Sequence, residues 1–124
     1  MTDAPHIVET ALSIATEAHR DQRDKAGAPY ILHPIRVMLA QTDDAARAAA
    51  LLHDVIEDCG WTAEGLAEAG IPSQVVVAVE ALTRRPGEDY MDFVRRAAAD
   101  PIAKRVKLAD VEDNLDLEVA FVHV

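Results

Sequence analysis

The sequence predicts an all-α protein in which residues 1–124 form a single compact domain. Half of the residues are hydrophobic but only 4% are aromatic, so Ala, Val, Leu and Ile must fill the core. Alanine, which is abundant here, has the highest helix propensity of any residue. Apolar residues recur at helical spacing in one segment after another, and no segment shows the alternation typical of a strand. No linker or internal repeat divides the chain, which is long enough to bury one core.

The first helix is expected to begin at a cap formed by Thr2 or Asp3 and to end between His19 and Gln22. Its apolar stripe consists of Ile7, Ala11, Ile14, Ala15 and Ala18. The charged residues 20–25 follow it, and a glycine and two prolines then indicate a loop.

Two more helices are expected before residue 60. A short one covers residues 35–41 and follows Pro34, because proline fits the first position of a helix. A longer one runs from Asp44 to about Glu57, with Thr42 or Asp43 as its cap.

The C-terminal half predicts further helical segments, which bring the total to six or seven. They are a short segment over residues 62–70, a helix beginning at Pro72 and Ser73, a helix anchored by Tyr90, Phe93 and Val94, and a last helix beginning at Asp100 and Pro101. The β-branched run Val75–Val79 also suits a strand. We favour a helix there, because Val75, Val79 and Leu82 are spaced i, i+4, i+7.

The densest group of polar side chains is the run His53 to Asp58, directly after the apolar run Ala48–Leu52. In a continuous helix, residues four apart, such as His53 and Glu57, stack on one face. One imidazole and three carboxylates would then crowd together, which suits a divalent metal with a water to activate. A helix that simply ends in surface acids is the alternative.

Two further residues are candidate metal ligands together with His53 and Asp54. His33 stands at a helix entrance after a rigid loop, and Asp110 lies between apolar neighbours. Two imidazoles and two carboxylates suit manganese, iron, cobalt or zinc, and leave positions open for water and substrate. Taken alone, His33 can simply pack at its turn, and Asp110 can pair with Lys107 one turn earlier.

The composition narrows the classes of function. The formal net charge of −10 argues against nucleic-acid binding, since no basic stripe is present. The one cysteine, Cys59, rules out an internal disulfide and suits a reducing cytoplasm; we expect a small, partly buried thiol and a cytoplasmic protein. No signal peptide and no apolar run of membrane-spanning length is present.

Four segments form an ordered set over roughly residues 7 to 117. They are Ala18-His19 with Gln22 and Lys25-Ala26-Gly27; Pro29-Tyr30-Ile31-Leu32-His33-Pro34; Ala50 to Asp58; and Val106 to Asp110 with Asn114. Through these segments the chain resembles the HD-superfamily metal-dependent phosphohydrolases. More narrowly, it resembles the hydrolase domain of RelA/SpoT-type enzymes and the small stand-alone alarmone hydrolases, which implies a single HD-type domain.

The resemblance also implies roles for individual residues. The implied ligands of one divalent metal ion, usually manganese, are His33, His53, Asp54 and Asp110. Glu57 and Asp58 would position and deprotonate the attacking water. Lys25 and Asn114 would hold the nucleotide, and Arg23 or Arg20 would assist. The implied reaction is hydrolysis of the 3′ pyrophosphate ester of ppGpp or pppGpp, which gives GDP or GTP and pyrophosphate.

The chain departs from the family pattern on the substrate side. Asp24 replaces the arginine of an Arg-Lys pair, and Arg23 is the candidate to compensate. Asp113 stands where a histidine is common, and Asp116 and Leu117 stand where an arginine and a threonine are usual. A loop with Arg84, Arg85 and Tyr90 either closes over the nucleotide or is an ordinary surface loop.

Two alternatives to alarmone hydrolysis follow. One keeps the metal chemistry but acts as a phosphatase on another nucleotide, such as NADPH or a nucleoside monophosphate. The other is a non-catalytic module that binds a nucleotide or a protein partner. No synthetase domain follows within these residues, so we expect no bifunctional enzyme. The sequence leaves the oligomeric state open.

Overall fold

The computed structural model describes residues 6–122, apart from the side chains of residues 116–122. These residues form α-helices and no strand, which confirms the predicted all-α fold. The helices are α1 (His6–Ala18), α2 (Leu32–Leu39), α3 (Asp44–Leu52), α4 (Val55–Cys59), α5 (Ala63–Glu68), α6 (Ser73–Ala81), α7 (Tyr90–Ala98) and α8 (Pro101–Val122). No helix within residues 6–122 is both long and apolar enough to cross a membrane.

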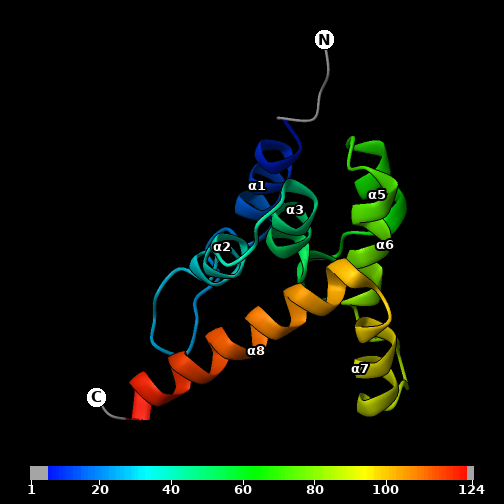
Figure 1. Ribbon diagram of the computed structural model, residues 1–124. Coiled ribbons are helices and arrows are strands. Elements are labelled where there is room, and N and C mark those ends of the chain that lie inside the picture. Colours follow the sequence, from blue (N-terminus) through cyan, green and yellow to red (C-terminus); the bar gives the residue numbers. More distant parts are fainter. Residues whose placement is uncertain (1–5, 123–124) are drawn as a thin grey trace.

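Helix α3 lies at the centre of the arrangement, with α1 and α2 on one side and α6 and α8 on the other (Figure 1). Its residues Ala46, Ala48, Ala49, Ala50, Leu51 and Leu52 are all buried. Alanine side chains are short, so neighbouring backbones can approach α3 closely and still pack densely. The alanine-rich composition therefore yields a tight core without large aromatic residues.

Helix α8 is a long diagonal that runs from beside α7 to beside α2 (Figure 1). Ala103 and Val106 pack into the core, and Asp110 lies one turn farther along the same face. The crossing brings Asp110 to α2 and α3, although it is 77 residues from His33 in sequence. The functional site depends on this crossing.

The predicted single helix from Asp44 to about Glu57 is wrong, because the helix is interrupted at His53 and Asp54. The Nδ1 atom of His53 donates to the Ala50 carbonyl at 2.6 Å, so the side chain uses an acceptor near the end of α3. Asp54 directly precedes α4, and its carbonyl accepts from the Asp58 amide at 2.9 Å. The extra helix follows from this break, and His53 does not stack above Glu57 as in a continuous helix.

Most other boundaries follow the predicted caps. The Asp43 side chain accepts from the Ala46 amide, the Thr62 side chain from the Gly65 amide, and Asp100 from two amides of α8. The run Val75–Val79 is helical, as predicted. Pro34 is the third residue of α2 instead of its predecessor. The predicted caps Thr2 and Asp3 lie outside the described residues.

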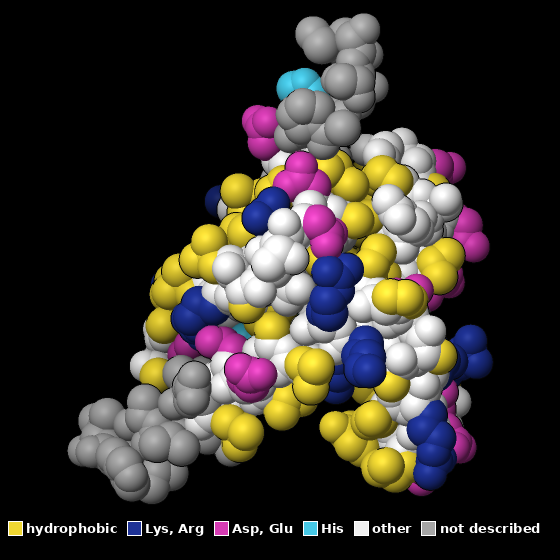
Figure 2. Space-filling view, in the orientation of Figure 1, with side chains coloured by type: hydrophobic (Ala, Val, Ile, Leu, Met, Phe, Trp, Pro, Cys, Tyr) yellow, Lys and Arg dark blue, Asp and Glu magenta, His cyan; other side chains and the backbone are white. Residues whose placement is uncertain are grey.

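Charges of both signs are interspersed on one face of the described residues. On the face shown in Figure 2, dark blue and magenta side chains lie among one another and no basic stripe forms. An ion pair such as Arg105 with Asp43, at 2.9 Å, joins α8 to the start of α3. Such exposed pairs contribute little to stability individually.

The cap at Asp43 gives a prediction for stability. We expect Asp43→Ala to lower the free energy of unfolding by about 1 kcal/mol, because the Ala46 amide loses its acceptor. Asp43→Asn keeps a capping oxygen, so it should retain most of the stability. Urea denaturation of both variants checks this; equal losses in the two would assign the effect to the ion pair with Arg105 instead.

Candidate active site

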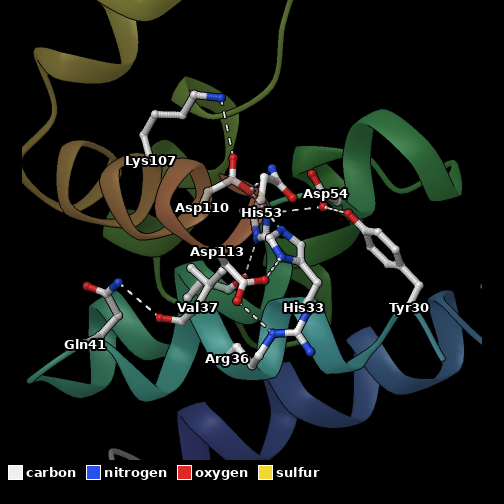
Figure 3. Close-up of polar contacts among 12 residues, drawn as sticks. Tyr30, His33, Arg36, Val37, Gln41, His53, Asp54, Lys107, Asp110 and Asp113 are labelled. Carbon is white, nitrogen blue, oxygen red and sulfur yellow. Dashed lines mark hydrogen bonds and ion pairs between the residues drawn. The ribbon is translucent and has the colours of Figure 1, made fainter. Parts of the chain in front are cut away.

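Four polar side chains converge between α2, α3, α4 and α8 (Figure 3). They are His33 from α2, His53 from the end of α3, Asp54 before α4, and Asp110 from α8. Ligand atoms of His33, His53 and Asp54 lie within 4.8 Å of one another. Asp110 Oδ1 lies 2.8 Å from His33 Nε2 and 3.3 Å from His53 Nε2. The structure therefore brings together all the predicted metal ligands, which lie up to 77 residues apart in sequence.

Both imidazole rings are held so that their Nε2 atoms face the same space. The Nδ1 atom of His33 contacts Asp113 Oδ2 at 2.6 Å, and Nδ1 of His53 contacts the Ala50 carbonyl at 2.6 Å. Both partners are acceptors, so each Nδ1 carries a proton and donates it. This leaves Nε2 as the inward-facing atom of each ring, which is the usual arrangement of a metal-bound histidine.

The surroundings of the His53 Nε2 atom favour a bound cation at this position. It is buried, and no hydrogen bond reaches it from any of the described residues. Asp54 Oδ2 lies 3.1 Å away and Asp110 Oδ1 lies 3.3 Å away, within ion-pair range. A buried nitrogen between two carboxylates is satisfied by a divalent metal that all of them bind. The residues thus fit a divalent-metal site.

The charges in the site are strongly coupled. Burial alone lowers the pKa of His53, but the charges of Asp54 and Asp110 outweigh it and raise that pKa well above its usual value. Burial raises the pKa of Asp54, but the His53 charge outweighs it and lowers that pKa to about 2. Contacts with His33 and His53 likewise overcome burial and lower the pKa of Asp110. Both carboxylates are therefore ionised at neutral pH.

Tyr30 orients Asp54 and was not singled out as a site residue from the sequence. Its hydroxyl donates to Asp54 Oδ2 at 2.5 Å (Figure 3). Burial and the Asp54 charge raise the pKa of Tyr30, so the hydroxyl keeps its proton. The Tyr30 ring lies 4.9 Å from the His19 ring and 5.6 Å from the His33 ring. The sequence feature that could have identified Tyr30 is its place in the segment Pro29 to Pro34, which also contains His33.

Asp113 and Arg36 form a second contact between α2 and α8. Asp113 Oδ1 accepts from Arg36 Nε at 2.7 Å, while its Oδ2 accepts from His33. Sequence reasoning noted Asp113 only as a departure from the family pattern and missed Arg36. Both stand three residues after a candidate ligand in the same helix, which was the available signal.

The expected pairing of Asp110 with Lys107 also exists. Lys107 Nζ lies 3.5 Å from Asp110 Oδ2, while Asp110 Oδ1 faces the two imidazoles. The structural role and the proposed ligand role therefore use different oxygens of one carboxylate.

Glu57 and Asp58 are exposed on α4, three and four residues after Asp54 in the sequence. Glu57 Oε1 accepts from the Arg84 amide at 3.0 Å, so the loop between α6 and α7 holds this carboxylate. Burial and the charges of Asp54 and Glu57 raise the pKa of Asp58. Among the described residues, no hydrogen bond joins Glu57 to the two imidazoles, so its catalytic role stays a prediction.

The loop between α6 and α7, which holds Glu57, is stabilised by hydrogen bonds from Arg96. Arg96 donates to the carbonyls of Glu80 and Thr83 and to both carboxylate oxygens of Glu88. The Arg96 hydrogen bond lowers the pKa of Glu88 to about 2, so the pair stays charged. Arg84 and Arg85 also line a hollow of about 630 Å³ with Trp61. None of the four converging residues lines that hollow.

The predicted substrate residues lie at two places. Asn114 is on α8, and its Nδ2 donates to Asp110 Oδ1 at 3.3 Å. Arg23 and Lys25 are exposed in the loop between α1 and α2, where Arg23 forms an isolated β-bridge with Pro29. Asp24 lies between them, and its Oδ1 accepts from the amides of two residues of the same loop. The side chains of Asp116 and Leu117 lie outside the described residues.

The chain is similar to known proteins over most of its length. A family model described as HD domain matches residues 11–117. The guanosine-3′,5′-bis(diphosphate) 3′-pyrophosphohydrolase of Aquifex aeolicus is 33% identical over 120 residues, which cover 87% of this chain and 17% of that protein. The chain therefore spans only about a sixth of that relative's length.

Shorter animal proteins match over more of their length. The mouse guanosine-3′,5′-bis(diphosphate) 3′-pyrophosphohydrolase MESH1 is 35% identical over 127 residues, covering 92% of this chain and 70% of that protein. A solved structure described as a metazoan ortholog of SpoT that hydrolyzes ppGpp has a TM-score of 0.77 and 33% identity. That match covers 91% of this chain and 71% of the solved one.

Proposed function

Because this chain belongs to the HD domain family, we propose that it is a divalent-metal-dependent 3′-pyrophosphohydrolase of guanosine-3′,5′-bis(diphosphate). The observation that carries this proposal is the convergence of two imidazoles and two carboxylates on one point, with the Nδ1 atom of each ring held by a hydrogen-bond acceptor. Relatives that bear this activity in their names, including MESH1, support the choice of substrate.

We assign the metal to His33, His53, Asp54 and Asp110, with manganese as the ion. A bound divalent ion lowers the pKa of water and neutralises negative charge on a phosphoryl group. The chain's own contribution is orientation. The Ala50 carbonyl and the Asp113 carboxylate fix the rings, and the Tyr30 hydroxyl fixes Asp54.

Glu57 and Asp58 are proposed to handle the attacking water. Glu57 is exposed beside the site and acts as the general base, while the Arg84 amide limits where its carboxylate can lie. The raised pKa of Asp58 makes its carboxylate a better proton acceptor than an ordinary aspartate.

The substrate is proposed to lie between the loop of residues 19–31 and α8. Lys25 and Arg23 supply positive charge on one side, and Asn114 lies beside Asp110 on the other. Asp24 replaces an arginine of the family. Its carboxylate accepts hydrogen bonds from two amides of its own loop, so it does not hold the guanine base. Recognition of guanine would therefore depend on Arg23 and Lys25.

The proposal is tested by incubating the protein with ppGpp and Mn²⁺ and measuring release of pyrophosphate. We expect turnover that EDTA abolishes. Glu57→Gln should lower kcat by about 100-fold, as expected for the loss of a general base, with little change in Mn²⁺ binding. Glu64→Gln, at an exposed acid of α5, is the matched control and should retain activity. A lack of pyrophosphate release at high enzyme concentration would contradict the proposal.

A phosphatase acting on another nucleotide is the second candidate. Asp24 and Asp116 favour it, because they put acids where the family pattern has arginines. A panel of nucleotides, including NADPH and nucleoside monophosphates, separates the two by product, since a phosphatase releases phosphate and not pyrophosphate. A non-catalytic binding module is contradicted by any metal-dependent turnover that Glu57→Gln removes.

A further inference from the structure

We infer that Asp113 is a positioning residue that orients His33 for the metal, and that Arg36 moderates its charge. The inference rests on the proposed function, since it assumes that His33 binds a metal. It concerns a position at which this chain departs from the family pattern, because Asp113 stands where a histidine is common.

The geometry places Asp113 directly behind the ligand. Its Oδ2 lies 2.6 Å from His33 Nδ1, on the side of the ring opposite the Asp110 contact at Nε2 (Figure 3). His33 is only 3% exposed, so water has little access to replace this acceptor. A carboxylate behind a ligating imidazole fixes the tautomer and the ring orientation, and makes Nε2 a better electron donor.

Arg36 completes the arrangement from the same helix as His33. Its Nε donates to Asp113 Oδ1 at 2.7 Å, so the two oxygens of Asp113 serve two different residues of α2. The arginine draws electron density away from the carboxylate and weakens the polarisation of His33. Removal of Arg36 should therefore leave a carboxylate that polarises His33 more strongly.

Substitutions at Asp113 and at Arg36 have different expected effects and test this, with a control at Glu112. Asp113→Asn keeps an oxygen that can accept from Nδ1 but removes the charge, and should weaken Mn²⁺ binding about tenfold. Asp113→Ala removes the acceptor and should weaken it by about 100-fold. Arg36→Gln should leave Mn²⁺ binding as tight as in the wild type or tighter. Glu112→Gln, an exposed neighbour on α8, removes the same charge and should have no effect.

Mn²⁺ affinity is measured by titration with electron paramagnetic resonance of the free ion, on variants that unfold cooperatively. The ¹⁵N shift of His33 Nδ1 should change in Asp113→Asn and stay unchanged in Glu112→Gln. A merely structural contact between α2 and α8 predicts that Arg36→Gln and Asp113→Asn weaken binding alike, and that result would overturn the inference.

The outcomes separate this inference from the proposed function. Wild-type affinity in Asp113→Asn, together with pyrophosphate release by the wild type, overturns the role of Asp113 alone. Weaker Mn²⁺ binding in Asp113→Asn, in a protein that releases no pyrophosphate from ppGpp, supports the role of Asp113 and contradicts the proposed substrate.

Discussion

We expect His53→Gln to abolish Mn²⁺ binding and to lower kcat/KM for ppGpp by about 1000-fold or more, which corresponds to about 4 kcal/mol of transition-state stabilisation. The Nε2 atom of His53 lies between Asp54 and Asp110, so its loss removes the nitrogen that both carboxylates surround. Gln has a similar length but presents an amide, which is a poor ligand beside two carboxylates. The carboxylates would then repel each other without a shared cation.

The effect must be separated from a loss of fold, because His53 is buried and its ring also contacts the Ala50 carbonyl. Circular dichroism and the unfolding transition in EDTA establish whether the variant is folded. His6→Gln is the matched control, since His6 is an exposed residue of α1 far from the site in sequence. A folded His53→Gln variant that binds Mn²⁺ like the wild type would remove His53 from the ligand set.

Local signals predicted most of the helices correctly. Asp43, Thr62 and Asp100 are capping residues whose side chains reach amides two or three positions away, so their effect depends on short stretches of sequence. The break at His53 was not predicted, because the apolar run Ala48–Leu52 continues smoothly into it. The cause is a side-chain contact with the Ala50 carbonyl, which helical periodicity does not show.

The candidate ligands were found from their residue types and from the family pattern, but the groups that orient them were not. Tyr30 and Asp113 act on Asp54 and His33 across 24 and 80 positions of the sequence. The Asp113 contact forms only through the crossing of α8 over α2, and the Tyr30 contact only through the packing of α2 beside α3. No local pattern contains either arrangement. The break at His53 also decides which way Asp54 points, so the geometry of the site depends on the feature that sequence reasoning missed.

We expect the affinity for Mn²⁺ to rise steeply with pH above neutrality. Burial alone lowers the pKa values of His33 and His53, but nearby carboxylates raise both above the ordinary histidine value of about 6.5. In the metal-free protein both rings therefore hold a second proton to higher pH than an ordinary histidine does, and a metal must displace those protons. Each displaced proton makes the affinity rise about tenfold per pH unit, so two give about 100-fold. The affinity for Mn²⁺ should stop rising once the pH exceeds the raised pKa values of both histidines.

The stability of the metal-free protein should change in the opposite direction. A histidine whose pKa is raised on folding contributes stability that is complete below its unfolded pKa and is lost as the pH rises through its folded pKa. Metal-free protein should therefore melt at lower temperature as the pH rises, while the stabilisation by Mn²⁺ grows. Asp54 and Asp110 set the acid limit, since their lowered pKa values contribute stability that is lost only at strongly acidic pH.

Thermal unfolding with Mn²⁺ and with EDTA, from about pH 6 to about pH 9, measures both effects in one series, because this range begins near the ordinary histidine pKa of about 6.5. The gap between the two melting temperatures should widen with pH in the wild type, because the proton and the metal compete for the same nitrogens. It should be absent in His53→Gln and unchanged in His6→Gln. A gap that stays constant with pH would mean that the ion does not displace protons from His33 and His53, and so that these rings are not its ligands.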